Sequence, residues 1–397
     1  MPDEYPEYPH HSQMLEYLRA YAAHFGVDRR IEYRTPVERI EPASDNDWIV
    51  TLARGEKRRY GAVVVANGHN WDPKYPNLPG EFHGQAFHSA SYRTPDLFTG
   101  KRVLVIGAGN SGCDIAVDAV KAGARRVFHS MRRGYHILPK FIMGRPVDQI
   151  YSQMLKLHLP LAVRRMAAKL AIWLVQGSNR NAGLPEPDHR LFETHPLVNQ
   201  LLPYFVRHGS IEPKPDVTGL EGDAVRFSDG SRKKVDVLVY ATGYRHTFPF
   251  LDSTLLNWEN GRPGLHLNLF HPEYDTLFVA GLIQPNSGEI FLLHWQSRAI
   301  ALFLRALECG APAADWLRER KRKMEAELSS GIRYSESPRH SLEVEQGSYY
   351  RELKQVVKEL EKDLEAEDHK VQKELAMDSG LLSGYRSKFR KKLSSLT

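Results

Sequence analysis

The stretch from residue 103 to residue 112 constrains the fold of this 397-residue chain more than any other segment. Residues 103–106 are a short apolar run, typical of a buried parallel strand, and Gly107-Ala-Gly109-Asn-Ser-Gly112 follows directly. Gly107 permits a tight turn, Gly109 lets the backbone approach a pyrophosphate, and Gly112 lets the next helix pack close to the strand. The spacing therefore predicts a dinucleotide-binding turn, with a purely structural turn as the alternative.

The helix after this turn is predicted to begin near Asn110 and to direct its free N–H groups and the positive end of its dipole at phosphate. A second strand at residues 126–130 follows at the expected distance, which supports a βαβ unit. Cys113 lies on this helix and is most simply a small packing residue. The predicted nucleotide contacts in the turn and helix are Gly107, Gly109, Asn110, Ser111, Gly112, Cys113 and Asp114.

The residues after the second strand indicate which nucleotide binds. An NAD site usually has an acidic residue roughly 20 positions beyond the turn, where it bonds the ribose 2′-hydroxyl. This chain has Ser130, Arg132 and Arg133 there. A hydroxyl and two guanidiniums suit a 2′-phosphate, which Arg grips by two parallel charge-assisted hydrogen bonds. NADPH is therefore predicted over NADH, with Arg133 as an ordinary surface residue the alternative.

Several separated motifs in the expected order resemble the flavin-containing monooxygenase family. They are Phe82-x-Gly84-x-x-x-His88-x-x-x-Tyr92, the segments 107–116 and 130–134, and Tyr240-Ala-Thr-Gly-Tyr244. The resemblance covers about residues 1–355. It implies an enzyme in which NADPH reduces FAD and one oxygen atom of O2 passes to a nucleophilic nitrogen or sulfur of a small molecule, as in an N,N-dimethylaniline monooxygenase. The related Baeyer–Villiger monooxygenases usually carry Trp at the position of Tyr92, so this residue favours the branch that oxidises heteroatoms.

The same resemblance exposes a gap at the amino end. The family begins with a flavin-binding βαβ unit that carries its own G-x-G-x-x-G motif, and no such motif precedes Gly107 in this sequence. We therefore expect an FAD domain that is incomplete at its N-terminus. The resemblance assigns Val37 to the FAD adenine and Gln284 to a position close to the flavin, with sheet packing as the alternative for both. Two other functions stay open: an NADP-binding oxidoreductase fragment without stable flavin, and a non-catalytic binding protein that retains the fold.

Three buried strands that end in small residues are predicted to share the carboxyl edge of one open α/β sheet, where ligands bind. The first, at residues 62–66, ends in Asn67-Gly68, which lets a ligand approach the backbone. The other two are residues 236–241 and 277–280. The resemblance makes this sheet the flavin domain, so Asn67 and Gly68 are predicted to contact the cofactor.

The predicted fold is α/β, with two dinucleotide-binding, Rossmann-like domains and a helical C-terminal tail. Residues 1–95 and 236–313 are assigned to the FAD-binding domain. Residues 96–235 are assigned to the NADP-binding domain with a helical insertion, and residues 314–397 to a charged helical extension. The NADP domain therefore divides the FAD domain in sequence.

Two apolar segments have more than one interpretation. Residues 155–175 are strongly apolar but interrupted by Arg164, Arg165 and Lys169. This segment is a helix lying on a membrane, a cover over a substrate entrance or, most simply, a helix packed on its own domain. In the C-terminal extension, four apolar residues recur at helical spacing, which is compatible with weak self-association and a homo-oligomer. They are Leu353, Val357, Leu360 and Leu364.

The composition narrows the class of protein. A net charge of +6 favours anionic ligands but does not demand nucleic acid. Cys113 and Cys309 are too far apart for a dithiol or metal pair, and no other metal-spaced cluster stands out. We expect no stable membrane span, because no apolar run of about 18 residues occurs. We expect a cytoplasmic enzyme, because no secretory signal is recognised.

No catalytic side chain can be assigned from the sequence. His88 invites such a role, but it lies in the segment that joins the domains, so an orienting or packing role is favoured. In a flavin enzyme the cofactor carries the chemistry, while the protein supplies binding, orientation and exclusion of water.

Overall fold

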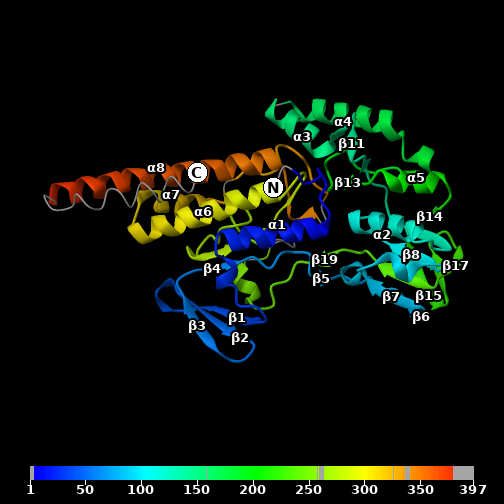
Figure 1. Ribbon diagram of the computed structural model, residues 1–397, viewed down its shortest axis with the longest axis horizontal. Helices are drawn as coiled ribbons and strands as arrows, with labels where there is room; N and C mark the ends of the chain where they lie inside the picture. The colour runs from blue at the N-terminus through cyan, green and yellow to red at the C-terminus, as the bar shows by residue number, and fades with distance from the viewer. Residues whose placement is uncertain are drawn as a thin grey trace.

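The computed structural model describes residues 4–157, 159–256, 258, 263–324, 326–335 and 340–378 of the chain, with residue 45 and residues 366–378 described by their backbone alone. This part of the chain mixes helices with parallel and antiparallel strands, as expected for an α/β protein. Figure 1 shows a sheet covered by helices at one end and a group of long helices at the other.

A five-stranded parallel sheet forms one end of the molecule. Its strands, in spatial order, are β14 (Ile211–Lys214), β9 (Arg126–Ser130), β8 (Arg102–Ile106), β18 (Val237–Tyr240) and β7 (Gln85–His88). Helix α2 (Asn110–Lys121) follows β8 and packs against β8 and β9. The predicted strand–turn–helix–strand unit is confirmed. The strand order reverses between β8 and β18, and open α/β sheets bind ligands at such a point.

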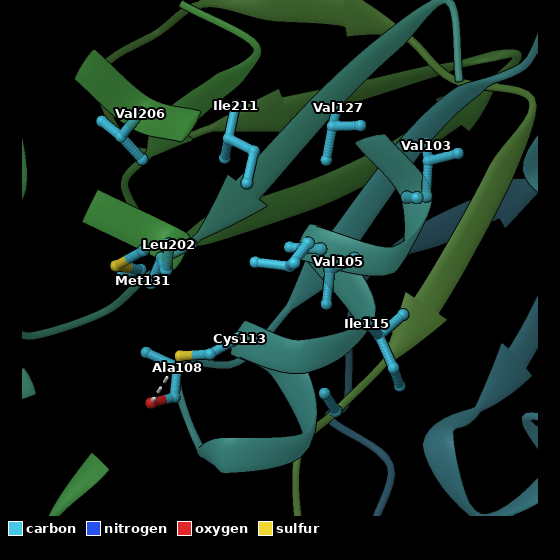
Figure 2. Close-up of a cluster of buried hydrophobic side chains, with 14 of the residues drawn as sticks. Val103, Val105, Ala108, Cys113, Ile115, Val127, Met131, Leu202, Val206 and Ile211 are labelled. Atoms are coloured by element: carbon cyan, nitrogen blue, oxygen red, sulfur yellow. Dashed lines mark hydrogen bonds between the residues drawn. The ribbon is translucent and has the colours of Figure 1, made fainter. Parts of the chain in front are cut away.

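An apolar core fills the space between this sheet and α2 (Figure 2). Val103 and Val105 of β8 are fully buried, and so is Cys113 on the helix. Burying each valine side chain contributes about 1.5–3 kcal/mol. The alternate residues of the same strands, Leu104 and Phe128, belong to a different cluster, which also contains Val225. The sheet is therefore covered on both faces.

The covering element on the second face is a four-stranded sheet. Its strands, in spatial order, are β17 (Arg232–Lys234), β16 (Ala224–Phe227), β15 (Val217–Gly222) and β6 (Gly80–Phe82). β15 pairs with β16 in antiparallel and with β6 in parallel orientation.

Strand β18 corrects the prediction that residues 236–241 share a sheet with residues 62–66 and 277–280. β18 lies between β8 and β7 and pairs with both in parallel. A continuous apolar run is typical of buried parallel strands in any sheet, so the pattern does not identify the sheet to which a strand belongs. The sheet thus includes strands from both sides of the predicted domain limits at residues 95 and 235. The division into domains otherwise stays a prediction.

The other end of the molecule contains shorter strands. An antiparallel meander consists of β1 (Val37–Pro42), β2 (Trp48–Leu52) and β3 (Lys57–Tyr60), and β4 (Val63–Val65) pairs in parallel with β20 (Leu277–Val279). The indole Nε1 of Trp48 is buried and donates to Thr276 Oγ1 at 2.9 Å. The two chain segments that connect the ends of the molecule pair as β5 (Asp72–Pro73) and β19 (Tyr244–Arg245).

Long helices pack together at this end (Figure 1). They are α6 (Ile290–Cys309), α7 (Pro312–Lys323) and α8 (Gln346–Asp378). The apolar stripe that suggested self-association is buried against α6 and α7 within the same chain: the exposed fractions of Leu353, Val357, Leu360 and Leu364 are 0%, 1%, 0% and 3%. The stripe is therefore not available for pairing with a second copy, and oligomerisation stays a prediction without this support.

Helix α6 is the one helix among the described residues that is long and apolar enough to cross a membrane, by length and composition. One of its faces is buried against α8, and buried side chains along it include Leu292, Ala299 and Phe303. Core helices of globular proteins have the same composition, so the expectation that the chain has no stable span stays a prediction.

An insertion of helices and short strands follows β9. It contains β10 (Ile137–Leu138), β11 (Phe141–Ile142), β12 (Arg145–Pro146), α3 (Val147–Lys156), α4 (Leu161–Gln176), β13 (Leu197–Val198) and α5 (Leu201–Arg207). The apolar segment 155–175 is thus divided between two helices, because Pro160 stands at the N-cap of α4. Helix α1 (His11–His24) has no buried residue, and the short strands β21 (Gln284–Pro285) and β22 (Glu343–Val344) pair in parallel.

Glu345 joins the insertion to the C-terminal helix. Its Oε2 accepts the backbone N–H of Ser348 at 2.7 Å and so caps α8. Its Oε1 lies 3.2 Å from Nη1 of Arg164 on α4, and both side chains are almost completely buried. Tyr151 of α3 accepts a hydrogen bond from the same Nη1 at 2.8 Å. One carboxylate therefore holds three helices together.

We predict that Glu345→Ala lowers the free energy of unfolding by about 3–5 kcal/mol, because it removes the cap and leaves Arg164 buried without its carboxylate. The control is Glu319→Ala, which breaks an exposed pair with Lys323 and is expected to cost less than about 1 kcal/mol. Urea unfolding followed by circular dichroism measures both. Equal losses in the two variants would contradict the role assigned to Glu345.

Candidate nucleotide and substrate site

The turn after β8 is shaped by two glycines that leave no room for a side chain. Gly107 has φ +114°, and a Cβ there would lie 2.3 Å from the carbonyl oxygen of Ala241. A Cβ at Gly112 would lie 1.9 Å from the carbonyl oxygen of Gly107. Helix α2 therefore begins directly against the strand, as the spacing predicted. Its N-cap, Gly109, has no side chain to bond the first amides, which leaves these groups for an anion.

A buried histidine of β9 contacts this turn, and its role was not predicted from the sequence. His129 is fully buried, and its Nε2 lies 3.0 Å from the carbonyl oxygen of Gly107. Burial lowers the pKa of His129 to about 4, so the ring is neutral and Nε2–H donates to that carbonyl. A single histidine in an apolar strand carries no pattern that a sequence could reveal.

The predicted contacts on α2 differ in where their side chains lie. Ser111 is exposed, whereas Cys113 is completely buried in the core with Sγ 4.0 Å from Ala108 O. Asp114 accepts a hydrogen bond from Asn199 Nδ2 at 2.7 Å. Desolvation of the carboxyl raises the pKa of Asp114, although the residue as a whole is exposed. The side chain of Cys113 is therefore a packing residue, as the simpler interpretation predicted. The contacts of these residues with a nucleotide stay predictions.

The three residues predicted to select NADPH lie at or just after the end of β9. They differ in whether their polar groups are free to bind a phosphate. Ser130 is 2% exposed and its hydroxyl donates to Pro215 O at 2.8 Å, so it already has a partner. Arg132 is exposed. Arg133 makes an ion pair with Asp188, with Nη2 2.6 Å from Oδ1. A phosphate would therefore meet Arg132 directly, and would compete with Asp188 for Arg133.

The residues predicted to contact flavin do not all lie close together. β4 and β20 lie side by side, and His69 Nδ1 lies 3.3 Å from Gly281 O, so Gly68 and Gly281 follow adjacent strand ends. Asn67 and Gly68 are exposed, and no described atom lies within 4 Å of a Cβ built on Gly68. This open strand edge fits the close approach of a flat cofactor.

The other two predicted flavin residues occupy different elements. Gln284 begins β21, three positions beyond Gly281, and its N–H donates to Leu342 O at 2.7 Å. Val37 begins β1, is 39% exposed and pairs with Leu52 of β2. The structure therefore brings Gln284 near the strand edge, while Val37 belongs to the meander.

A cavity of about 260 Å³ lies between the nucleotide turn and the segment after Gln284. Asn110, which begins α2, lies on one wall, and Asn286 lies on another. Helices α3 and α4 contribute mainly apolar walls, including Ala168 and Ala171. Its volume lies just below the usual range for ligand sites, and its apolar character suits a small organic molecule.

Two polar groups at the cavity wall, Asn286 and Tyr151, are bonded to each other. Asn286 Nδ2 donates to Tyr151 Oη at 2.7 Å, and Asn286 Oδ1 accepts the N–H of Gln346 at 3.1 Å. Burial raises the pKa of Tyr151, so its hydroxyl stays protonated at neutral pH. Asn110 similarly holds the opposite wall, because its Oδ1 accepts the N–H of Val198 at 3.1 Å. Sequence reasoning missed Tyr151 and Asn286, since they come from distant segments, whereas Asn110 was predicted as a nucleotide contact.

His88 has the orienting role that was favoured. Its Nδ1 accepts the N–H of Ala90 at 3.1 Å, so its Nε2–H donates to Gly243 O at 3.0 Å. Burial lowers the pKa of His88, in agreement with a neutral ring. Tyr92 donates to Asp118 of α2 at 3.1 Å. The motif that contains these residues therefore fixes the connecting segments to the nucleotide-binding sheet.

Comparison with known proteins gives consistent matches. The sequence matches the model of the family described as flavin-binding monooxygenase-like over residues 1–365. Flavin-containing monooxygenase 5 of Oryctolagus cuniculus is 33% identical over 376 residues, which cover 90% of this chain and 68% of that protein. Flavin-containing monooxygenase 2 of Homo sapiens is 35% identical over 335 residues, which cover 79% of this chain and 61% of that protein.

Solved structures share the fold. A cyclohexanone monooxygenase from Rhodococcus sp. Phi1, bound to NADP+, superposes with a TM-score of 0.59 at 19% identity, over 86% of this chain and 82% of that one. An ε-caprolactone-bound cyclohexanone monooxygenase gives a TM-score of 0.64 at 18% identity, over 88% and 83%. The predicted fold class is confirmed. The named relatives are enzymes, which argues against a non-catalytic binding protein.

We predict that Arg132→Ala combined with Arg133→Ala weakens NADPH binding at least tenfold and leaves NADH binding unchanged, since each charge-assisted contact contributes about 1.5–3 kcal/mol. Asp188→Asn is expected to strengthen NADPH binding, because it frees Arg133. Titration calorimetry measures the affinity of each variant for NADPH and for NADH. Lys234→Ala is the control for loss of an exposed positive charge. An unchanged preference for NADPH in the double variant would show that the 2′-phosphate assignment is wrong.

Glu289, beside the end of β20, gives a pH prediction. Burial raises the pKa of this carboxyl to about 6, from an ordinary value near 4.5. The folded protein therefore binds this proton more tightly than the unfolded chain does, and stability is lost as the pH rises from about 4.5 to about 6. We expect the free energy of unfolding of the parent protein to fall by about 2 kcal/mol across this pH range. The Glu289→Gln variant is expected to lack this fall. Identical profiles for the variant and the parent protein would contradict the assignment.

Proposed function

Because the chain belongs to the flavin-binding monooxygenase-like family, we propose that it transfers one oxygen atom from O2 to a nitrogen or sulfur atom of a small organic molecule, with NADPH and FAD as cofactors. The observation that carries this proposal is the cavity between Asn110 of the nucleotide turn and Asn286, two positions beyond Gln284. A molecule held there lies between the two predicted cofactor sites. The bound cofactors would supply the electrons and activate O2, and the protein would position the substrate.

The cavity walls support an apolar substrate. Its lining is mainly aliphatic and aromatic, and the hydroxyl of Tyr151 already has hydrogen-bond partners in Asn286 and Arg164. A buried polar group that has its partners does not demand a polar substrate atom. Such walls exclude water and hold an apolar body by its shape.

Two observations favour nitrogen and sulfur as the atoms oxidised. Tyr92 stands where Baeyer–Villiger enzymes usually carry Trp. In addition, a relative from Pan troglodytes, named dimethylaniline monooxygenase [N-oxide-forming] 2, is 35% identical over 335 residues. The cytoplasmic location expected from the sequence stays a prediction beside this proposal.

The test begins with the absorption spectrum of the purified protein, before and after addition of FAD. NADPH consumption and product are then measured with N,N-dimethylaniline, with methyl phenyl sulfide and with cyclohexanone. We expect a flavin spectrum, an N-oxide and a sulfoxide. Protein that stays colourless after FAD addition would refute the monooxygenase proposal for this chain, and lactone as the main product would place it in the Baeyer–Villiger branch.

We predict that Ala171→Trp, which fills the cavity, lowers formation of oxygenated product at least about tenfold while NADPH consumption continues, because the indole takes the volume of the substrate. Ala162→Trp is the matched control, since it adds the same side chain to an exposed position of the same helix. Product yield and NADPH consumption are measured together. Equal product loss in both variants would show that the cavity is not the substrate site.

A further inference from the structure

The loop that carries Asp188 lies directly against the segment that follows β9. Gly134, in that segment, forms a parallel β-bridge with Pro187. A Cβ on Gly134 would lie 2.2 Å from the carbonyl oxygen of Glu186, so a side chain there would not fit between the two segments. Asp188 is 55 positions away from Arg133 in the sequence, yet the fold brings the two side chains into contact.

The same loop reaches the nucleotide turn. Pro185 lines a small cavity together with Ala108 of the turn and Met131, the first residue after β9. In an NAD site, an acidic residue near the end of the second strand usually bonds the ribose 2′-hydroxyl. The sequence around β9 lacks such a residue, but the fold supplies an acidic side chain there from the loop of Asp188.

One oxygen of the Asp188 carboxylate is bonded within the protein and the other is not. Arg133 donates to Oδ1 from Nε at 3.1 Å and from Nη2 at 2.6 Å, and Nδ1 of His189 lies 2.9 Å from the same oxygen. No side chain in the described part of the chain donates to Oδ2. Because the Asp188 side chain is 58% exposed, Oδ2 is open to a ligand.

His189 fixes the direction of this carboxylate. Its side chain is 5% exposed, and its Nε2 lies 2.8 Å from Thr194 Oγ1. Since Nδ1 faces a carboxylate, Nδ1 carries the proton, and the hydroxyl of Thr194 donates to Nε2. The hydrogen bond from His189 and, to a smaller extent, the contact with Arg133 lower the pKa of the Asp188 carboxyl. Asp188 is therefore ionised at neutral pH and held in one orientation.

We infer that Asp188 determines how the site chooses between the two nicotinamide nucleotides. With NADH, Oδ2 accepts a hydrogen bond from the ribose 2′-hydroxyl. With NADPH, Arg132 and Arg133 bind the 2′-phosphate, while the negative charge of Asp188 repels it. The chain therefore binds NADH as well as NADPH, and Asp188 reduces its preference for NADPH. The role of Asp188 rests on the nucleotide site of the proposed function.

The alternative is that Asp188 only neutralises Arg133. Arg–carboxylate pairs with that single role are frequently bidentate, with one nitrogen on each oxygen. Arg245 and Asp72 bond in this way, from Nε to Oδ2 and from Nη2 to Oδ1. In the pair of Arg133 and Asp188, both nitrogens donate to Oδ1 instead. The free Oδ2 distinguishes this pair from an ordinary bidentate ion pair.

The test is titration calorimetry of the full chain with NAD+ and with NADP+, which carry the same riboses as NADH and NADPH and cannot reduce a bound flavin. We expect Asp188→Asn to weaken NAD+ binding at least about tenfold and to strengthen NADP+ binding about threefold. The matched control is Asp223→Asn, which removes a carboxylate of similar exposure from an ion pair with Lys234 and is expected to change neither affinity.

Three outcomes would contradict the role of Asp188. They are an unchanged NAD+ affinity in Asp188→Asn, an equal loss in both variants, and a parent protein that binds NADP+ but not NAD+. Absence of binding of both nucleotides would overturn the nucleotide site of the proposed function, and the role of Asp188 with it.

A second comparison separates a direct contact with the ribose from an effect through Arg133. Asp188→Asn is added to the variant that combines Arg132→Ala and Arg133→Ala. If Oδ2 bonds the ribose, the added substitution still weakens NAD+ binding at least about tenfold. If Asp188 acts only by holding Arg133, the added substitution changes nothing, and the inference is refuted. Circular dichroism checks that each variant folds.

Discussion

The buried carboxylate of Glu345 is the group on which the substrate region depends. It caps α8 through Ser348 and pairs with Arg164 of α4, and the same guanidinium bonds the hydroxyl of Tyr151. Taking two charges out of water is costly, and in a buried pair the remaining donors and acceptors must also find partners. Here most of them do, through the helix cap, Tyr151 and Asn286, while Nε of Arg164 is buried without a hydrogen-bond partner among the described residues. The position of the cavity wall is therefore tied to the C-terminal helix, although the two are far apart in sequence.

The nucleotide turn depends on a different constraint, the crowding around one carbonyl group. The oxygen of Gly107 accepts a hydrogen bond from His129 and lies against Gly112, where no Cβ fits. This contact sets how closely α2 begins to the strand. The direction of the first amides of α2, and so the place where phosphate would sit, follows from that distance.

These two regions differ in how far the sequence predicts them. The turn was predicted well, because Gly107 and Gly112 are five positions apart and their spacing reports a local steric requirement. The network around Glu345 was not predicted, since its members are brought together only by the fold. The strand at residues 237–240 lies between these cases: its existence was predicted, but its place beside β8 depends on pairing that an apolar run does not specify. The stripe on α8 was also read correctly as an apolar face, while its partner proved to be α6 of the same chain.

The two faces of α4 have different structural roles. Its inner face is fixed by Arg164, so Ala168 and Ala171 hold a defined wall of the cavity. Its outer face makes no contribution to that wall, and its apolar residues are costly in water unless another surface covers them. Since a rigid inner face prevents the helix from turning, the exposure of the outer face is a consequence of how the cavity is built. One short helix thus contributes apolar side chains both to the cavity, on its inner face, and to the surface of the molecule, on its outer face.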